Sequence, residues 1–413
     1  MDASETDTAT GPKPSTANAL IKLLYVARGL RGFGDGFAVI ILPAYMTALG
    51  YDAVAVGVVA TASLLGTALL TLLTGWIAPR HDLRPLLIAG ACLMAATGVA
   101  FPGVEHIVLI TLVAFIGTIN PSGGDLGVLV PLEHAVLAHG ARDERRTEVF
   151  ARYSLVGALC TAAGSLAASL PDLFVASGGT NLAAFHLMFY AYAALGIACA
   201  ALYRHVPHTS GEERAPQTPL GPSRGTVYKL AALFSIDAFA GGFVVQSLLV
   251  LWLFERFDLS LSAAGLFFFW SSTLSAFSYP VAAWLARRIG LVNTMVFTHI
   301  PSSIFLILAA FSPNLYVALG LLLLRSALSQ MDVPTRTSYV MAVVTPAERP
   351  AAASVTAVPR SLASAISPAI AGALLMTSFT GLPLVVCGTL KIAYDLALLV
   401  SFRHIKPPEE QGR

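Results

Sequence analysis

The chain has 413 residues, of which 56% are hydrophobic and only 12% are charged. Soluble domains usually have roughly 45–50% apolar and about 25% charged residues, so this composition excludes an ordinary soluble fold and indicates a polytopic membrane protein. The formal net charge of +2 gives no reason to expect a nucleic acid or an acidic macromolecule as a partner.

Apolar runs of at least about 18 residues predict about twelve transmembrane helices, which makes the fold class an all-α polytopic membrane protein. The predicted spans cover residues 17–49, 53–78, 85–103, 107–137, 149–171, 183–203, 227–255, 261–286, 291–312, 315–344, 350–378 and 383–403. Prolines fall inside several of these runs, so we expect kinked and tilted helices.

Basic residues are concentrated in alternate connections between the predicted spans. By the positive-inside rule these connections are cytoplasmic, and an even number of spans then places both termini in the cytoplasm. Residues 204–226 are rich in proline and glycine, and we expect them to form a cytosolic linker between helical bundles at 17–203 and 227–403. The polar ends, 1–16 and 404–413, are predicted to be cytosolic tails, the first of them disordered.

The two parts of the chain repeat each other at a shift of about 206 residues. With Asp237 as the counterpart of Arg31, Gly36 aligns with Gly242 and Phe37 with Phe243. The repeat predicts two related halves, each with six helices.

A loop motif also occurs twice. Gly75-Trp-Ile-Ala-Pro-Arg80-His-Asp-Leu-Arg84 follows the second span, and Ala283-Trp-Leu-Ala-Arg-Arg288-Ile-Gly-Leu follows the eighth. Both copies resemble the cytoplasmic loop signature of the major facilitator superfamily, Gly-x-x-x-Asp-Arg-x-Gly-x-Arg, although neither has its aspartate. The resemblance implies two six-helix bundles that rock about a central site, with Arg80, Arg84 and Arg288 contributing to a cytoplasmic loop gate.

Ionisable residues lie deep inside the predicted spans. Arg31 is roughly 15–20 Å from the start of its span, where an unpaired charge costs about 2.5–3.5 kcal/mol. Such charges predict either a salt bridge between the halves, joining Arg31 to Asp237 or Glu133 to Arg336, or local pairs at i and i+4. The local pairs are Arg31 with Asp35, Asp332 with Arg336, and Lys391 with Asp395, and for the last of these we favour local pairing.

Two sets of residues are candidates for the transport site. Guanidinium groups bind carboxylate or phosphate groups well, and Arg336 and Arg360 are the strongest of the substrate candidates. The full substrate set is Arg28, Arg31, Gln330, Arg336 and Arg360. Partly desolvated carboxylates are suited to proton coupling or gating, and the candidates are Asp35, Asp125, Glu133, Asp237 and Asp332. For His134 and His299 we favour a packing role.

Other chemistry has little support in the sequence. The cysteines form no Cys-x-x-Cys pair, and His205 with His208 is a weak metal motif, so we expect no metal and no cofactor. The leading hypothesis is a non-enzymatic secondary transporter of a small polar or anionic organic solute, coupled to protons and monomeric, in the lipid bilayer of the cell's inner membrane. A multidrug or antibiotic efflux antiporter of the same fold is the alternative, and a non-transporting membrane sensor is the third hypothesis.

Overall fold

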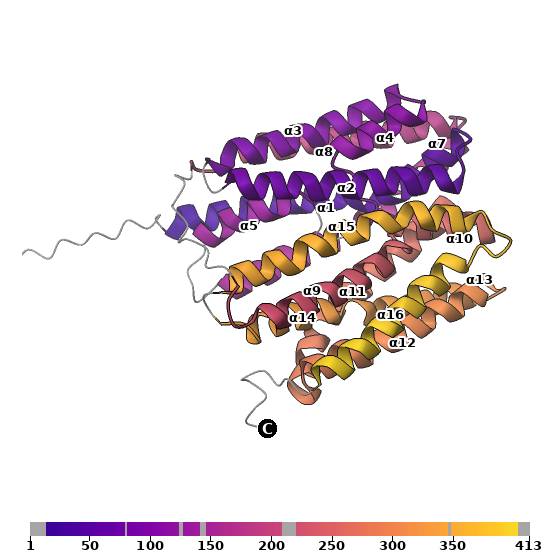
Figure 1. Cartoon of the computed structure of the whole chain (residues 1–413). Helices are drawn as coiled ribbons and strands as arrows, with labels where there is room; N and C mark the ends of the chain where they lie inside the picture. Colours follow the sequence, from indigo (N-terminus) through magenta and orange to yellow (C-terminus); the bar gives the residue numbers. More distant parts are fainter. Residues whose placement is uncertain are drawn as a thin grey trace, which may run out of the picture.

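The computed structural model describes residues 14–78, 81–123, 127–140, 146–208, 220–345 and 348–403. These residues form helices joined by short connections, and none of them lies in a β-strand. The helices run roughly along one direction, with α1–α8 grouped above α9–α16 in Figure 1. The all-α prediction is therefore confirmed for the described residues.

The helices of the first part of the chain are α1 (Pro14–Ala48), α2 (Ala53–Ile77), α3 (Leu83–Ala100), the 3-10 turn η2 (Phe101–Gly103), α4 (Ile107–Ile116), α5 (Leu129–Gly140), α6 (Arg146–Ala167), α7 (Leu170–Ala176) and α8 (Asn181–Tyr203). Short polar side chains mark several helix starts: Asp52 accepts from the Ala55 N–H and Thr180 from the Ala183 N–H. Such caps satisfy amide groups that the helix itself leaves without partners.

The second part of the chain contains α9 (Arg224–Gly242), α10 (Gln246–Phe257), α11 (Leu261–Ile289), α12 (Leu291–Phe311), α13 (Leu315–Ser329), α14 (Asp332–Ala342), α15 (Arg349–Leu375) and α16 (Leu382–Phe402). Ten helical segments among the described residues are long and apolar enough to cross a membrane. This confirms a multi-pass membrane protein, whereas the number of about twelve crossings stays a prediction.

Several spans predicted as continuous are interrupted. The predicted span 107–137 consists of α4 and α5, and residues 117–128 between them are not helical where they are described. Pro121 has no amide hydrogen to donate, and Gly123 adopts a φ of 65°, which a glycine accommodates without strain. The span 227–255 is similarly split into α9 and α10, and 315–344 into α13 and α14.

The buried apolar side chains form three separate clusters. One contains residues from both parts of the chain, including 37–42 of α1 and 248–253 of α10. The second is built from the first part up to Val206, and the third from Val227 to Phe402. The two parts of the chain therefore share a core at one end of the molecule and have separate cores elsewhere.

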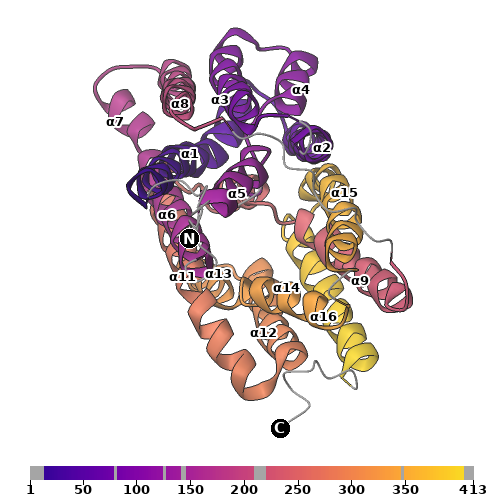
Figure 2. The same ribbon diagram turned by 90° about the vertical axis from the view of Figure 1, so that its left-hand side faces the viewer.

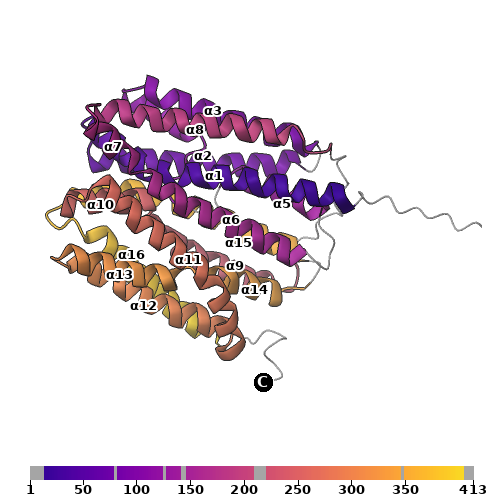
Figure 3. The same ribbon diagram turned by 180° about the vertical axis from the view of Figure 1, so that it is seen from behind.

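Helices of the two parts meet along two sides of the molecule. α2 packs against α15 (Figure 1), and α6 packs against α11, as the view from behind shows (Figure 3). At the first contact a side chain on Gly57 would lie 2.5 Å from the Pro368 carbonyl oxygen, so glycine is what permits this approach. The end-on view in Figure 2 shows α5 and α14 on opposite sides of the molecule's centre, between these two contacts.

Candidate functional site

A buried carboxylate organises the first part of the chain. Glu133, on α5, is 0% exposed and forms an ion pair with Arg31 of α1. The Tyr203 hydroxyl donates to Glu133 Oε1 at 2.6 Å, and the Tyr153 hydroxyl donates to Oε2. Four helices thus contribute one side chain each to this first cluster, defined as Arg31, Glu133, Tyr153 and Tyr203.

A second arginine lies next to this cluster. The Arg28 guanidinium stacks over the Tyr153 ring, with 5.5 Å between its Cζ atom and the ring centroid. A Cβ atom at Gly157 of α6 would lie 2.3 Å from Arg28 Nε, so the glycine at this position makes room for the guanidinium. Arg28 is 1% exposed, which removes it from any open surface in this conformation.

A corresponding cluster organises the second part. Asp237 of α9 accepts from Arg336 Nη1 at 3.0 Å and from Lys391 Nζ at 2.6 Å. Arg336 also lies 3.2 Å from Asp332 Oδ2. The second cluster, Asp237, Arg336, Asp332 and Lys391 with the neighbouring His299 and Asp395, therefore shares its charges among several partners.

His299 connects two carboxylates of this cluster. Its Nδ1 atom is 3.1 Å from Asp395 Oδ1, and its Nε2 atom is 3.3 Å from Lys391 Nζ and 3.9 Å from Asp237 Oδ1. Asp395 is 0% exposed, and its Oδ2 atom has no hydrogen-bond partner in the described part of the chain. A buried carboxylate with one oxygen unbonded is costly unless a neighbouring group compensates it.

These contacts show which of the expected pairs form in this conformation. The structure has neither an Arg31 pair with Asp237 nor a Glu133 pair with Arg336, because each acid is paired within its own part of the chain. Of the local pairs, Asp332 with Arg336 is confirmed. The favoured local pair of Lys391 and Asp395 is wrong, since Lys391 turns to Asp237 and Asp395 to His299.

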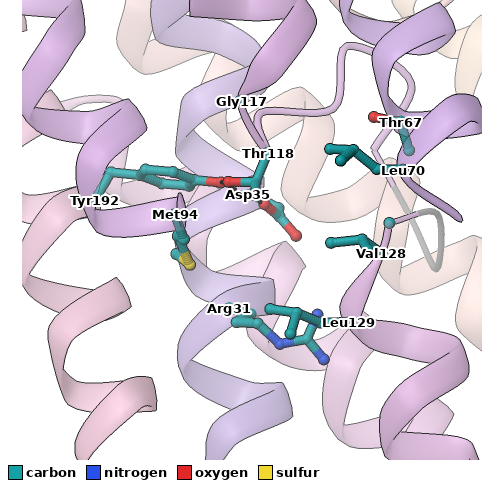
Figure 4. A pocket seen from close by; sticks show the side chains of 11 residues that line it. Arg31, Asp35, Thr67, Leu70, Met94, Gly117, Thr118, Val128, Leu129 and Tyr192 are labelled. Atoms are coloured by element: carbon teal, nitrogen blue, oxygen red, sulfur yellow. Dashed lines mark hydrogen bonds between the residues drawn. The ribbon is translucent and has the colours of Figure 1, made fainter. Parts of the chain in front are cut away.

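Asp35 also lacks its expected local partner. Arg31 is drawn to Glu133 instead, and the Asp35 carboxylate accepts a hydrogen bond of 3.4 Å from the Tyr192 hydroxyl. Figure 4 shows Asp35 directed into a pocket between Tyr192 and the pair Leu70 and Val128. The pocket is lined by Arg31, Asp35, Thr67, Leu70, Met94, Gly117, Thr118, Gly127, Val128, Leu129 and Tyr192.

Two arginines in the second part have no anionic partner among the described residues. Arg360 of α15 is half-buried and lies within electrostatic range of Arg336, Asp237 and Asp332, all of which are already paired. Arg325 of α13 is also half-buried. Gln330 caps the end of α13 and is half-buried, without a side-chain hydrogen bond in the described region.

Two of the expected site residues, Arg80 and Asp125, lie outside the described residues. Of the other two residues expected in the loop gate, Arg84 Nη1 lies 3.1 Å from His208 Nε2, and His208 Nδ1 contacts the Asp82 carboxylate. Arg288 is exposed and stacks over Trp284 at 5.2 Å. His208 thus joins the α2–α3 loop to the start of the segment between the two parts.

The other end of that segment is held by Glu348, which is 3% exposed and precedes α15. Its carboxylate accepts from the Ser223 hydroxyl at 2.8 Å, the Thr345 hydroxyl at 2.7 Å and the Gly221 N–H at 2.5 Å. Hydrogen bonds from Thr345 and Ser223 lower the pKa of Glu348 to about 2. The charged form is the one that these donors stabilise.

Sequence reasoning missed Tyr153 and Tyr203, and it considered Lys391 with Asp395 only as a local pair and His299 mainly as a packing residue. Tyr153, Tyr203 and Lys391 complete the two clusters, and His299 with Asp395 extends the second. Each tyrosine could have been suspected as a polar ring in an apolar span, but nothing in the spacing relates either to Glu133. Within the described residues no group of His, Cys, Asp or Glu side chains is placed to hold a metal ion.

Comparisons with known proteins agree with this architecture. An uncharacterized membrane protein of Saccharomyces cerevisiae is 25% identical over 92% of this chain and 94% of its own length. Among solved structures, the nucleoside transporter NupG superposes with a TM-score of 0.71 at 15% identity, covering 93% of this chain and 99% of its own. The xylose transporter XylE of E. coli gives 0.70 at 16% identity, covering 95% and 99%, and the human organic anion transporter MFSD10 gives 0.66 at 15%, covering 94% and 100%.

The sequence also matches the family description "Major Facilitator Superfamily" at residues 24–254 and 230–413, which together span nearly the whole chain. This match agrees with the loop motif, the helical architecture and the paired charges buried in both parts. The chain belongs to the major facilitator superfamily of membrane transporters.

Proposed function

We propose that this protein is a secondary active transporter that moves a small polar or anionic organic solute by alternating access, without enzymatic activity. In this proposal two six-helix bundles, α1–α8 and α9–α16, cross the membrane about twelve times in total. The broken pairs α4 with α5, α9 with α10 and α13 with α14 would each count as one crossing. Family membership supports transport. The two-bundle arrangement is supported by the buried ion pairs, since Arg31 pairs with Glu133 in the first part and Asp237 pairs with Arg336 in the second.

The distribution of apolar cores supports one state of the cycle. The end shared by both parts contains α10 and the second half of α1, where the Ser247 N–H donates to the Pro121 carbonyl at 3.0 Å. At the end where α1 begins and α16 ends, the buried apolar clusters of the described residues each belong to one part alone. We assign the shared end to the outside and the separated end to the cytoplasm, which makes this an inward-facing state with cytoplasmic termini.

The observation that carries the substrate proposal is the unpaired Arg360. Its neighbours Asp237 and Asp332 are already occupied by Arg336 and Lys391, so the protein offers no counter-ion among its described residues. A guanidinium near the middle of a span favours an anion from outside the protein. Arg336, by contrast, is less suited to the substrate than the sequence alone indicated, because its donors already face acids.

A thermal-shift screen of purified protein against organic anions and common drugs tests this proposal. We expect anions to stabilise the wild type and to lose that effect in Arg360→Gln. Arg325→Gln is the matched control, since it removes another unpaired guanidinium from the same part of the chain. Stabilisation by drugs alone, unchanged in Arg360→Gln, would instead favour multidrug efflux. Stabilisation by no solute of either class, together with no solute flux in liposomes, would favour a sensor.

Proton coupling is the second part of the proposal, and Asp395 with His299 supports it best. Glu133 and Asp237 each have a cation as partner, whereas Asp395 contacts a histidine through one oxygen and leaves the other unbonded. A proton can reside on this pair without creating an isolated charge. Solute transport in liposomes should collapse with an uncoupler, and Asp395→Asn should make the remaining transport insensitive to it. Transport indifferent to the uncoupler in the wild type would remove the coupling role.

The setting of the protein completes the proposal: a monomer in the inner membrane, with solute and protons as partners. The contacts of Arg84 and His208 support a role of the α2–α3 loop on the cytoplasmic side. Proteolysis of an epitope at either terminus in sealed inverted vesicles, but not in spheroplasts, is the expected result. Mass measurement of the detergent-solubilised protein should give one chain per particle.

A further inference from the structure

At the end that both parts share, an acidic side chain of the first part binds the start of a helix of the second part. The helices in question are α7 and α11, which are in contact there. The Asp172 carboxylate of α7 accepts from the Ser262 N–H at 3.0 Å and from the Ser262 hydroxyl at 2.6 Å. Ser262 lies in the first turn of α11, where amide groups have no partner within the helix. Asp172 therefore gives α11 an acceptor that belongs to the other part of the chain.

α11 also has an acceptor of its own at this end. Ser260 precedes the helix, and its hydroxyl oxygen accepts from the Ala263 N–H at 3.2 Å. The N-terminus of a helix carries a partial positive charge, so the carboxylate of Asp172 is favoured beside it. Ser260 serves α11 wherever that helix moves, because both belong to the second part. Asp172 serves it only while α7 and α11 are in contact.

A second contact of this kind lies on the other side of the molecule, between α2 and α15. The Ala369 N–H, which follows Pro368 in α15, donates to the Thr61 hydroxyl oxygen of α2 at 2.9 Å. A Cβ atom at Gly372 would lie 2.3 Å from the Ala53 carbonyl oxygen, so the glycine lets the two helices approach closely. Here too a backbone N–H of the second part donates to an acceptor of the first.

We propose that these contacts form a latch that holds the outer end closed, so that Asp172 and Thr61 set the ratio of outward-facing to inward-facing molecules. The inference rests on the proposed function, because a latch acts only if the two bundles rock. Opening the outer end separates α7 from α11 and α2 from α15, and each N–H then loses its acceptor. The latch consists of Asp172 with Ser262, Thr61 with Ala369, and the Pro121 carbonyl with the Ser247 N–H.

Distances between spin labels at the two ends measure this ratio in the full-length protein in lipid nanodiscs. The four native cysteines are first replaced by alanine. Exposed positions, one in each part of the chain, then receive the labels: Glu105→Cys with Tyr316→Cys at the outer end, or Ala201→Cys with Ile289→Cys at the cytoplasmic end. The wild type should show a major population with a short outer distance and a long cytoplasmic one, and a minor population with the reverse.

Loss of either side-chain acceptor should favour the outward-facing state. We expect Asp172→Ala to raise the ratio of outward-facing to inward-facing molecules roughly fivefold, and Thr61→Val to do the same. Thr61→Ser should keep the wild-type ratio, because it keeps the hydroxyl. The two losses should multiply when combined, since the contacts lie on separate sides of the molecule. Ser262→Ala should add nothing to Asp172→Ala, because its hydroxyl has then already lost its acceptor.

Ser260→Ala is the matched control. It removes the acceptor that α11 has within its own part, so it should lower the unfolding temperature and leave the ratio unchanged. An equal shift in Ser260→Ala, or the absence of a shift in either Asp172→Ala or Thr61→Val while the wild type populates both states, overturns the latch and leaves alternating access standing. One and the same state in the wild type and in every variant overturns the latch and the proposed alternating access together.

Discussion

The predicted repeat aligns Arg31 with Asp237 and Glu133 with Arg336, yet the two clusters that contain these residues are built differently. Around Glu133, one carboxylate is satisfied by one cation, Arg31, and by two neutral tyrosine hydroxyls. In the second cluster, Asp237 pairs with both Arg336 and Lys391. Arg336 also pairs with a second acid, Asp332. The comparison teaches that the first cluster depends on one ion pair, whereas the second spreads its charge over several partners.

The largest expected effect therefore comes from Glu133→Gln. This change leaves Arg31 buried without an acid in its cluster, and breaking a buried pair from one side costs about 3–5 kcal/mol. Thermal unfolding in detergent should show a large loss of stability. The double variant Arg31→Met with Glu133→Met is the control, because removing both charges together is expected to restore most of the stability. A single variant as stable as the double one would contradict the dependence on this pair.

Asp237→Asn should have a smaller effect. Arg336 keeps Asp332 at 3.2 Å, and Lys391 keeps His299 at 3.3 Å, so we expect a loss of about 1–3 kcal/mol in the same unfolding measurement. Adding Asp332→Asn should cost more than the sum of the two single changes, since both acids serve one guanidinium. A loss equal to that of Glu133→Gln would show that the second cluster has no reserve.

Tyr203→Phe tests the neutral donors of the first cluster. It removes the hydroxyl that donates to Glu133 Oε1 at 2.6 Å, and we expect it to lower the free energy of unfolding by about 1–2 kcal/mol. Tyr394→Phe is the matched control, because Tyr394 is a buried residue whose ring packs against His299 of the second cluster, without a hydrogen bond from its hydroxyl to Glu133. If the two variants lose equal stability, the ring rather than the hydroxyl carries the effect.

The smallest effect is expected outside the membrane, where Glu348 joins Gly221 and Ser223 to the start of α15. Its pKa is lowered from an ordinary value of 4.5 to about 2, so the stability it contributes is present above pH 4.5 and is lost as the pH falls toward 2. The unfolding temperature of the wild type should fall more than that of Glu348→Gln as the pH is lowered from 5 to 2. Parallel pH profiles for the two proteins would show that this carboxylate contributes nothing.

Much of the fold could be predicted from residue patterns. Long apolar runs indicate membrane helices because an unpaired backbone group is too costly in lipid. The interruption in 107–137 was less visible: a proline inside the run indicated a kink, but not a non-helical stretch that contacts α10, where the Ser247 N–H donates to the Pro121 carbonyl. Helix existence was therefore predictable and helix continuity was not.

The candidate site shows the same division. The depth of Arg31, Glu133, Asp237 and Arg336 could be read from the chain, because a charge far inside an apolar run requires compensation wherever its partner lies. The partners of these charges could not be read from the chain, since a neighbour four residues away competes for each charge with side chains from distant helices. Arg31 pairs with Glu133 and not with Asp35, which is four residues away. Lys391 likewise pairs with Asp237 and not with Asp395, which is also four residues away.

The sequence by itself determined that this is a membrane protein with charges deep inside its apolar runs, because hydropathy is a local property of the chain. Only the tertiary structure decided which of those charges neutralise one another. A buried ion selects whichever partner best replaces its lost hydration, and that choice depends on how helices distant in sequence pack together.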